Sequence, residues 1–92
     1  MIIAVDYDGT LSINGQTNIG LIKRLKGAQR RGDIVILWTC RSGGMLAEAC
    51  ANLVKHGFKP NYINENAPQV IAKYGDSRKI YADVYIDDKA AK

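Results

Sequence analysis

Apolar and polar residues alternate along the chain in blocks that predict strands and helices in turn. Four short apolar runs, rich in Ile and Val, have the composition of buried strands. Between them, apolar residues recur every three or four positions, which is the spacing of one buried helical face. The runs predict strands over 2–5, 34–38, 62–63 and within 80–86, and the spacings predict helices over about 18–31, 44–56 and 69–74.

Glycine and proline residues mark where the predicted helices begin and end. Gly32 and Gly57 directly follow the first two helical segments, at a position that favours glycine. Pro68 opens the third segment and Gly75 ends it. Strands that alternate with helices in this way form a parallel sheet with right-handed crossovers. We therefore expect one α/β domain over residues 1–92, a three-layer Rossmann-like parallel sheet flanked by helices.

Acidic residues gather where the first and the last predicted strands end. Asp6 and Asp8 follow the first strand, and Asp87 and Asp88 follow the last. Parallel strands end at the same edge of a sheet, so these carboxylates should lie together. Close carboxylates repel each other unless a cation or a shared proton lies between them, and ligands that are all oxygen favour Mg²⁺. The pattern predicts a Mg²⁺ site, and the simpler alternative is that Asp8-Gly9 is only a turn.

A hydroxyl and several cations are expected at the same edge. The second strand ends in Thr39, and Arg41 and the pair 43–44 (Gly-Gly) follow at a predicted helix start, a composition that suits a phosphate group. Lys79 lies just before the last strand, and the neighbouring Arg78 is an alternative for the same role. Acids, a hydroxyl and a lysine at strand ends together predict chemistry on a phosphate.

These residues resemble the four motifs of the haloacid dehalogenase-like (HAD) hydrolases. They occur in the family's order, at the ends of predicted strands, and the resemblance spans nearly the whole chain. The first motif is the specific one, since a lone Thr or Lys would mean little by itself. The matching segments are Asp6-x-Asp8-Gly9-Thr10, Thr39, Lys79 and Ile86-Asp87-Asp88.

The resemblance implies a HAD core with the strand order 3-2-1-4 and the activity of a phosphatase. The cap domain of many relatives is not expected, because the loop over 9–16 and the segment over 64–78 are too short to fold into a lid. The active site should then be open. An open site accepts a bulky substrate or takes walls from a neighbouring subunit, so we expect a homo-oligomer as one solution.

The resemblance also implies roles for individual residues. Asp6 would attack phosphorus and form an aspartyl-phosphate, and Asp8 would protonate the leaving oxygen and later deprotonate the attacking water. Thr39 would hold a phosphoryl oxygen, and Lys79 would neutralise its charge.

Two further residues are candidates to contact the substrate. Thr10 is one, although bracing the loop is its simpler role, and Arg41 is the other, although a solvated side chain is equally compatible with its place. The Mg²⁺ ligands that the resemblance implies are Asp6, Asp8, through its backbone carbonyl as well, Asp87 and Asp88.

Three alternatives use the same residues differently. Cys40 at a strand–helix junction suggests a cysteine phosphatase, but that class needs an arginine six residues later, where Leu46 stands. A receiver-like phosphoacceptor or Mg²⁺-binding module would carry an Asp at the end of a middle strand, and the strands over 34–38 and 62–63 end without one. A HAD scaffold without catalysis is the third alternative, and the presence of every motif residue weighs against it.

Net charge adds information about partners and location. The chain has thirteen Lys and Arg against nine acids, and without the four predicted site acids only five remain. The simpler explanation of this excess of basic residues is a solvated helix face. The sharper one is a binding partner, which would be a phosphorylated small molecule, a phosphorylated polymer end or nucleic acid. We expect a cytoplasmic protein with no membrane partner, since no signal peptide or membrane helix is evident. The basic residues concentrate on the first long helix, at Lys23, Arg24, Lys26, Arg30 and Arg31.

Overall fold

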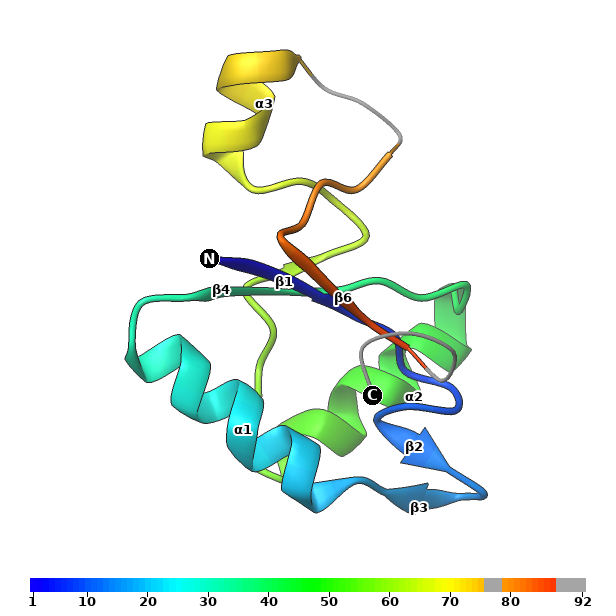
Figure 1. Cartoon of the computed structure of the whole chain (residues 1–92). Helices are drawn as coiled ribbons and strands as arrows, with labels where there is room; N and C mark the ends of the chain where they lie inside the picture. Colours follow the sequence, from blue (N-terminus) through cyan, green and yellow to red (C-terminus); the bar gives the residue numbers. More distant parts are fainter. Residues whose placement is uncertain (76–78, 88–92) are drawn as a thin grey trace.

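A computed structural model of the chain describes residues 1–75 and 79–87. Within them, the main sheet consists of β1 (Ile2–Val5), β4 (Ile34–Leu37), β5 (Tyr62–Ile63) and β6 (Val84–Ile86). All neighbours in this sheet are parallel, in the spatial order β5-β4-β1-β6 (Figure 1). Counted along the chain, these are the third, second, first and fourth strands of the sheet. The predicted parallel α/β architecture is confirmed.

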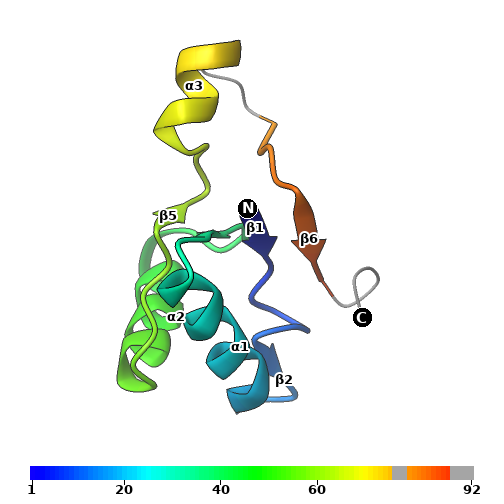
Figure 2. The same ribbon diagram turned by 60° about the vertical axis from the view of Figure 1, so that its left-hand side comes forward.

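The described helices are α1 (Ile19–Arg30), α2 (Gly43–Lys55) and α3 (Pro68–Tyr74). Helices α1 and α2 lie on one face of the sheet and α3 lies on the other (Figures 1 and 2). The side chains of β1 alternate accordingly: Ile3 and Val5 belong to the core under α1 and α2, whereas Ile2 and Ala4 belong to the core on the α3 side. The sheet is thus the middle of three layers. None of these helices is long and apolar enough to cross a membrane.

The helix ends follow the local sequence closely. The side chain of Asn18 caps α1 by accepting a hydrogen bond from the backbone N–H of Leu21 at 3.2 Å. Gly32 and Gly75 follow α1 and α3 with φ of +91° and +81°, a conformation in which glycine has no side chain to clash. Helix α2 begins at Gly43, one residue earlier than predicted.

One detail of the prediction is wrong. The loop expected over 9–16 contains an antiparallel hairpin of β2 (Ser12–Ile13) and β3 (Gln16–Thr17), joined by Asn14-Gly15 with both residues at positive φ. The last strand, Val84–Ile86, lies within 80–86 as predicted, and just before it the backbone N–H of Ala82 donates to the Tyr85 hydroxyl at 3.1 Å.

Candidate functional site

The ends of β1 and β6 bring two acidic residues together at the carboxyl edge of the sheet. Val5 is paired with Ile86, so Asp6 and Asp87 are the next residues along the two strands. The backbone N–H of Asp6 donates to the carbonyl of Ile86 at 3.0 Å, and both acids are half-buried. The first and last strands therefore meet as the sequence predicts, while Asp88 lies outside the described residues.

The chain that follows Asp6 is a tightly hydrogen-bonded turn. The Oδ1 atom of Asp6 accepts a hydrogen bond from the backbone N–H of Tyr7 at 2.8 Å. The Tyr7 carbonyl in turn accepts from the backbone N–H groups of residues 10–12. The Tyr7 ring is buried, and Asn52 of α2 donates to its hydroxyl at 3.1 Å. This turn fixes the direction in which the chain leaves β1.

Asp8 is held by an arginine from the loop after β4. Arg41 donates from Nε to one carboxylate oxygen of Asp8 and from Nη2 to the other, each at 2.9 Å. The guanidinium also lies 4.7 Å from the centre of the Tyr7 ring and donates from Nη1 to the carbonyl of Met45. The Asp8 side chain is 60% exposed, whereas that of Arg41 is 19% exposed. We call this arrangement of Tyr7, Asp8 and Arg41 the Arg41 clamp.

The Arg41 clamp changes the acidity of both partners. The hydrogen bonds from Arg41 lower the pKa of the Asp8 carboxyl below its ordinary value. Burial opposes this shift, and the positive charge of Arg41 adds to it. The same hydrogen bonds raise the pKa of Arg41. Asp8 is therefore ionised at neutral pH in this conformation. The prediction left Arg41 between substrate contact and simple solvation. In the structure Arg41 is bonded to Asp8, and its contact with substrate stays a prediction.

Thr39 sits in the loop after β4 and is held by a residue that the sequence analysis did not single out. Its backbone N–H donates to Oδ1 of Asn64 at 2.8 Å, and its hydroxyl accepts from the backbone N–H of Arg41 at 3.2 Å. Asn64 directly follows β5 and has φ of +52°. The signal available in the sequence was an asparagine at the end of a strand, beside the same edge.

Thr10 is buried, with 5% of its surface exposed. Its hydroxyl has no hydrogen-bond partner among the residues that the structure describes. Its carbonyl accepts a hydrogen bond from Nδ2 of Asn18 at 3.1 Å. The main chain of Thr10 thus makes a bracing contact with Asn18. Thr10 and Asp87 also line one groove, which is described below.

Lys79 is exposed and precedes β6 on the α3 side of the sheet. The buried side chain of Asn66 joins this segment to the chain after β5: it donates to the Lys79 carbonyl at 2.9 Å and accepts from the backbone N–H of Tyr81 at 2.7 Å. The competing cation, Arg78, lies outside the described residues. The role predicted for Lys79 stays a prediction.

Some of the predicted Mg²⁺ ligands are placed where they could bind such an ion. Asp6 and Asp87 stand on neighbouring strand ends and offer only oxygen, the donor that Mg²⁺ prefers. The Asp8 carboxylate is bonded to Arg41, so its main-chain carbonyl is the better donor. Across residues 1–75 and 79–87, no group of three or more His, Cys, Asp or Glu lies close enough to hold a metal. The fourth predicted ligand, Asp88, falls beyond that range.

Comparison with known proteins places the chain in a family without assigning its activity. No family model matches the chain, and no curated protein matches it. A solved structure described as a conserved protein coded by a locus from Bacteroides thetaiotaomicron is similar, with 34% sequence identity and a TM-score of 0.84. The match covers 98% of this chain and 77% of that one. The chain belongs to the same family as this conserved protein.

Proposed function

We propose that the protein is a Mg²⁺-dependent phosphatase of the HAD type, which hydrolyses phosphomonoesters through an aspartyl-phosphate on Asp6. The observation that carries the proposal is the carboxyl edge, where Asp6 and Asp87 follow paired strand positions and Asp8 stands two residues further on. The spatial order of the strands, 3-2-1-4 along the chain, is the one expected of a HAD core and supports the same proposal.

In the first step, a carboxylate oxygen of Asp6 bonds to phosphorus while the bond from phosphorus to the leaving oxygen breaks. A carboxylate is already ionised at neutral pH and needs no base to activate it. The protonated form of Asp8 gives its proton to the leaving oxygen, which departs as an alcohol.

In the second step, the oxygen of a water molecule bonds to the same phosphorus. Asp8, now a carboxylate, takes the proton of that water, and the bond from phosphorus to Asp6 breaks. Inorganic phosphate leaves and Asp6 is regenerated. A bound Mg²⁺ would supply positive charge next to the phosphoryl oxygens, and Asp6 and Asp87 would hold it with the Asp8 carbonyl.

The Arg41 clamp suits the second step better than the first. In the clamp, Asp8 is an ionised base, and donating a proton requires that Arg41 release it. A phosphoryl group presents paired oxygens that match a guanidinium as well as a carboxylate does. In this proposal Arg41 releases Asp8 and binds the incoming phosphate. Substrate binding thereby allows Asp8 to take up the proton that it later donates.

The test is hydrolysis of p-nitrophenyl phosphate in millimolar Mg²⁺, with and without a chelator. We expect turnover in Mg²⁺, loss of turnover in chelator, and loss of turnover in Asp6→Asn, because an amide does not form an acyl phosphate. Asp33→Asn is the matched control: Asp33 precedes β4 at the opposite edge, where it pairs with the N-terminal amine of Met1.

Two outcomes would contradict the proposal in different ways. Full activity in Asp6→Asn would show that Asp6 is not the nucleophile. Equal activity with and without chelator would show that the reaction does not need a metal ion. Stoichiometric release of p-nitrophenol without further turnover would instead indicate a phosphoacceptor.

A further inference from the structure

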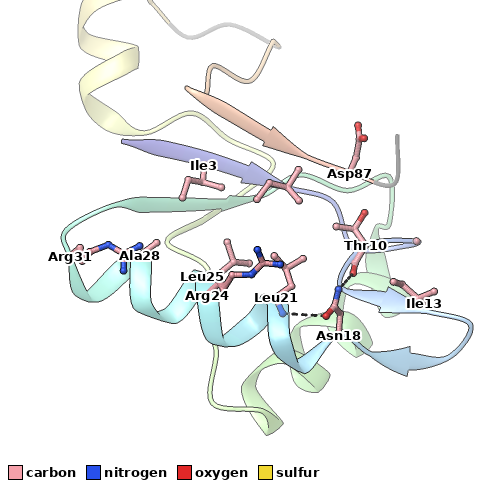
Figure 3. A pocket seen from close by; sticks show the side chains of 12 residues that line it. Ile3, Thr10, Ile13, Asn18, Leu21, Arg24, Leu25, Ala28, Arg31 and Asp87 are labelled. Carbon is pink, nitrogen blue, oxygen red and sulfur yellow. Dashed lines mark hydrogen bonds between the residues drawn. The ribbon is translucent and has the colours of Figure 1, made fainter. Parts of the chain in front are cut away.

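A groove of about 480 Å³ runs along α1 beside the candidate site (Figure 3). One end is formed by Thr10 and Asp87, and Asp87 is a predicted Mg²⁺ ligand. Apolar side chains line its length, among them Leu21 and Leu25 of α1 and Ile86 of β6. The volume is within the range of small-molecule sites, roughly 300–1,000 Å³, whose walls are mostly apolar with a few polar groups.

The groove also carries positive charge. Arg24 lines it, and Arg31 lines its far end, seven residues further on and about 10 Å along the helix at 1.5 Å per residue. In Figure 3, Arg24 lies beside Leu25, between Thr10 and Arg31. The sequence of α1 contains no acidic residue that could neutralise these arginines from the same helix. The charge of the wall thus favours an anionic ligand.

Thr10 lines the end of the groove nearest the acids. Its hydroxyl is buried and has no hydrogen-bond partner among the described residues. A buried hydroxyl without a partner is destabilising by roughly 1–3 kcal/mol. Figure 3 shows Thr10 at the groove end, below Asp87. Thr10 and Asp87 together therefore mark the end of the groove that lies nearest the candidate site.

We propose that this groove binds the leaving group of the substrate, and that this leaving group has an apolar body with a second anionic group. The proposal rests on the phosphatase function proposed above. The reacting phosphoryl group would lie at the Thr10 end, the body against Leu21, Leu25 and Ile86, and the second anion against Arg24. A nucleoside bisphosphate has this chemistry, with a base and sugar for the wall and a second phosphate for the arginine.

The test compares a nucleoside 3′,5′-bisphosphate with the corresponding nucleoside 5′-monophosphate in Mg²⁺. We expect kcat/KM to be at least tenfold higher for the bisphosphate. Arg24→Gln should lower this ratio by about tenfold to a hundredfold, the usual worth of a hydrogen bond to a charged group. Lys23→Gln is the matched control, because Lys23 is exposed on the same helix outside the groove, and it should leave the ratio unchanged.

A binding measurement keeps the proposal independent of turnover. Calorimetric titration of the bisphosphate into Asp6→Asn should show binding that weakens about tenfold or more when Arg24→Gln is added. Melting temperatures of all variants check that they fold.

The possible failures are distinguishable. If the unaltered protein does not hydrolyse p-nitrophenyl phosphate, the proposed function is wrong, whatever the groove binds. If it does, and the ratio is near one or Lys23→Gln lowers it as much as Arg24→Gln, the groove proposal is wrong. Equal binding with and without Arg24→Gln would also overturn it.

Discussion

Asp6 and Asp8 are two residues apart and have opposite surroundings. Asp6 is half-buried, next to β6, and its carboxylate accepts a hydrogen bond from the main chain. Asp8 is largely exposed, and both oxygens of its carboxylate accept hydrogen bonds from Arg41. The backbone direction of a strand end thus places Asp6, whereas a side chain 33 residues away places Asp8. Asp6 is positioned by the sheet, and Asp8 is positioned by a contact between side chains.

This difference matches the roles proposed for the two acids, with Asp6 as the nucleophile and Asp8 as the general acid and base. A nucleophile works best at a constant position, and a residue that both gives and takes a proton must change its charge. Since Arg41 lowers the pKa of Asp8, the availability of the acid form depends on where Arg41 is.

The largest effect should come from Asp6→Asn. We expect no measurable turnover of p-nitrophenyl phosphate and no phosphorylated protein, because the bond from phosphorus to the carboxylate is not formed. Intact-protein mass spectrometry after acid quench checks the second point. A phosphorylated protein in Asp6→Asn would show that another residue is the nucleophile.

Asp8→Asn should separate the two steps. With p-nitrophenyl phosphate, whose leaving oxygen needs little help from an acid, the first step should survive and the second should slow by about 10²–10⁴-fold. Phosphorylated protein should then accumulate, visible as a burst of p-nitrophenol equal to the protein concentration and by mass spectrometry. A steady-state rate like that of the unaltered protein would show that Asp8 is not the base.

Arg41→Gln should shift the pH dependence of the reaction. Without the Arg41 clamp, the pKa of Asp8 rises toward the ordinary value of about 3.9. For an alkyl phosphate, which needs the acid form of Asp8, the fall in kcat/KM with rising pH should therefore move to higher pH. Loss of a charge-assisted contact to phosphate should also lower kcat/KM by about tenfold.

Two variants control this experiment. Arg30→Gln removes an exposed arginine of α1 and should leave the pH profile in place. Arg41→Lys keeps the charge but not the two-pronged geometry, so its profile should lie between the others. An unmoved profile in Arg41→Gln would show that Arg41 does not control Asp8.

Mg²⁺ should raise the melting temperature by several degrees at a hundredfold excess over its Kd, since binding to the folded state alone contributes about 2.7 kcal/mol there. Asp87→Asn should shrink the shift, because the carboxylate beside Asp6 is lost. Asp8→Asn should keep most of it, because the main-chain carbonyl is unchanged. Differential scanning fluorimetry with and without Mg²⁺ measures the three shifts, and an equal shift in Asp87→Asn would remove that residue from the site.

The smallest effect concerns the stability of the fold at low pH. Because the folded-state pKa of Asp8 is lowered, its pairing with Arg41 stabilises the fold above the ordinary pKa, and this contribution disappears as pH falls through the lowered value. The difference in urea midpoint between the unaltered protein and Arg41→Gln should therefore narrow below about pH 4. The pair is exposed, so the difference should be small even at pH 7. A difference that widens toward low pH would contradict the assignment.

The sequence was sufficient for the alternation of strands and helices, because apolar runs and helix-ending residues report local preferences directly, whereas the expected strand order came from the family resemblance. It was also sufficient for the meeting of Asp6 with Asp87, since parallel strands that alternate with helices end at one edge. The hairpin at Asn14-Gly15 was readable from its turn residues and was missed because each of its strands has only two residues.

Contacts between side chains on different loops could not be predicted from the sequence. The pairing of Arg41 with Asp8 depends on how two loops approach each other, which packing decides. The same holds for Asn64 and Asn66, whose side chains join segments separated by 13 to 25 residues. The groove along α1 is lined by residues of that helix and by Ile86 of β6, a juxtaposition that periodicity does not report.

The position of β1 has a consequence for synthesis of the protein. This strand is made first but lies inside the sheet, between β4 and β6. The register pairs Ile3 with Val35 on one side and with Val84 on the other. An apolar segment therefore emerges from the ribosome long before its second neighbour exists, and pairings so distant in sequence form slowly. Ile2–Val5 therefore lacks one of its two sheet neighbours until β6 has been synthesised.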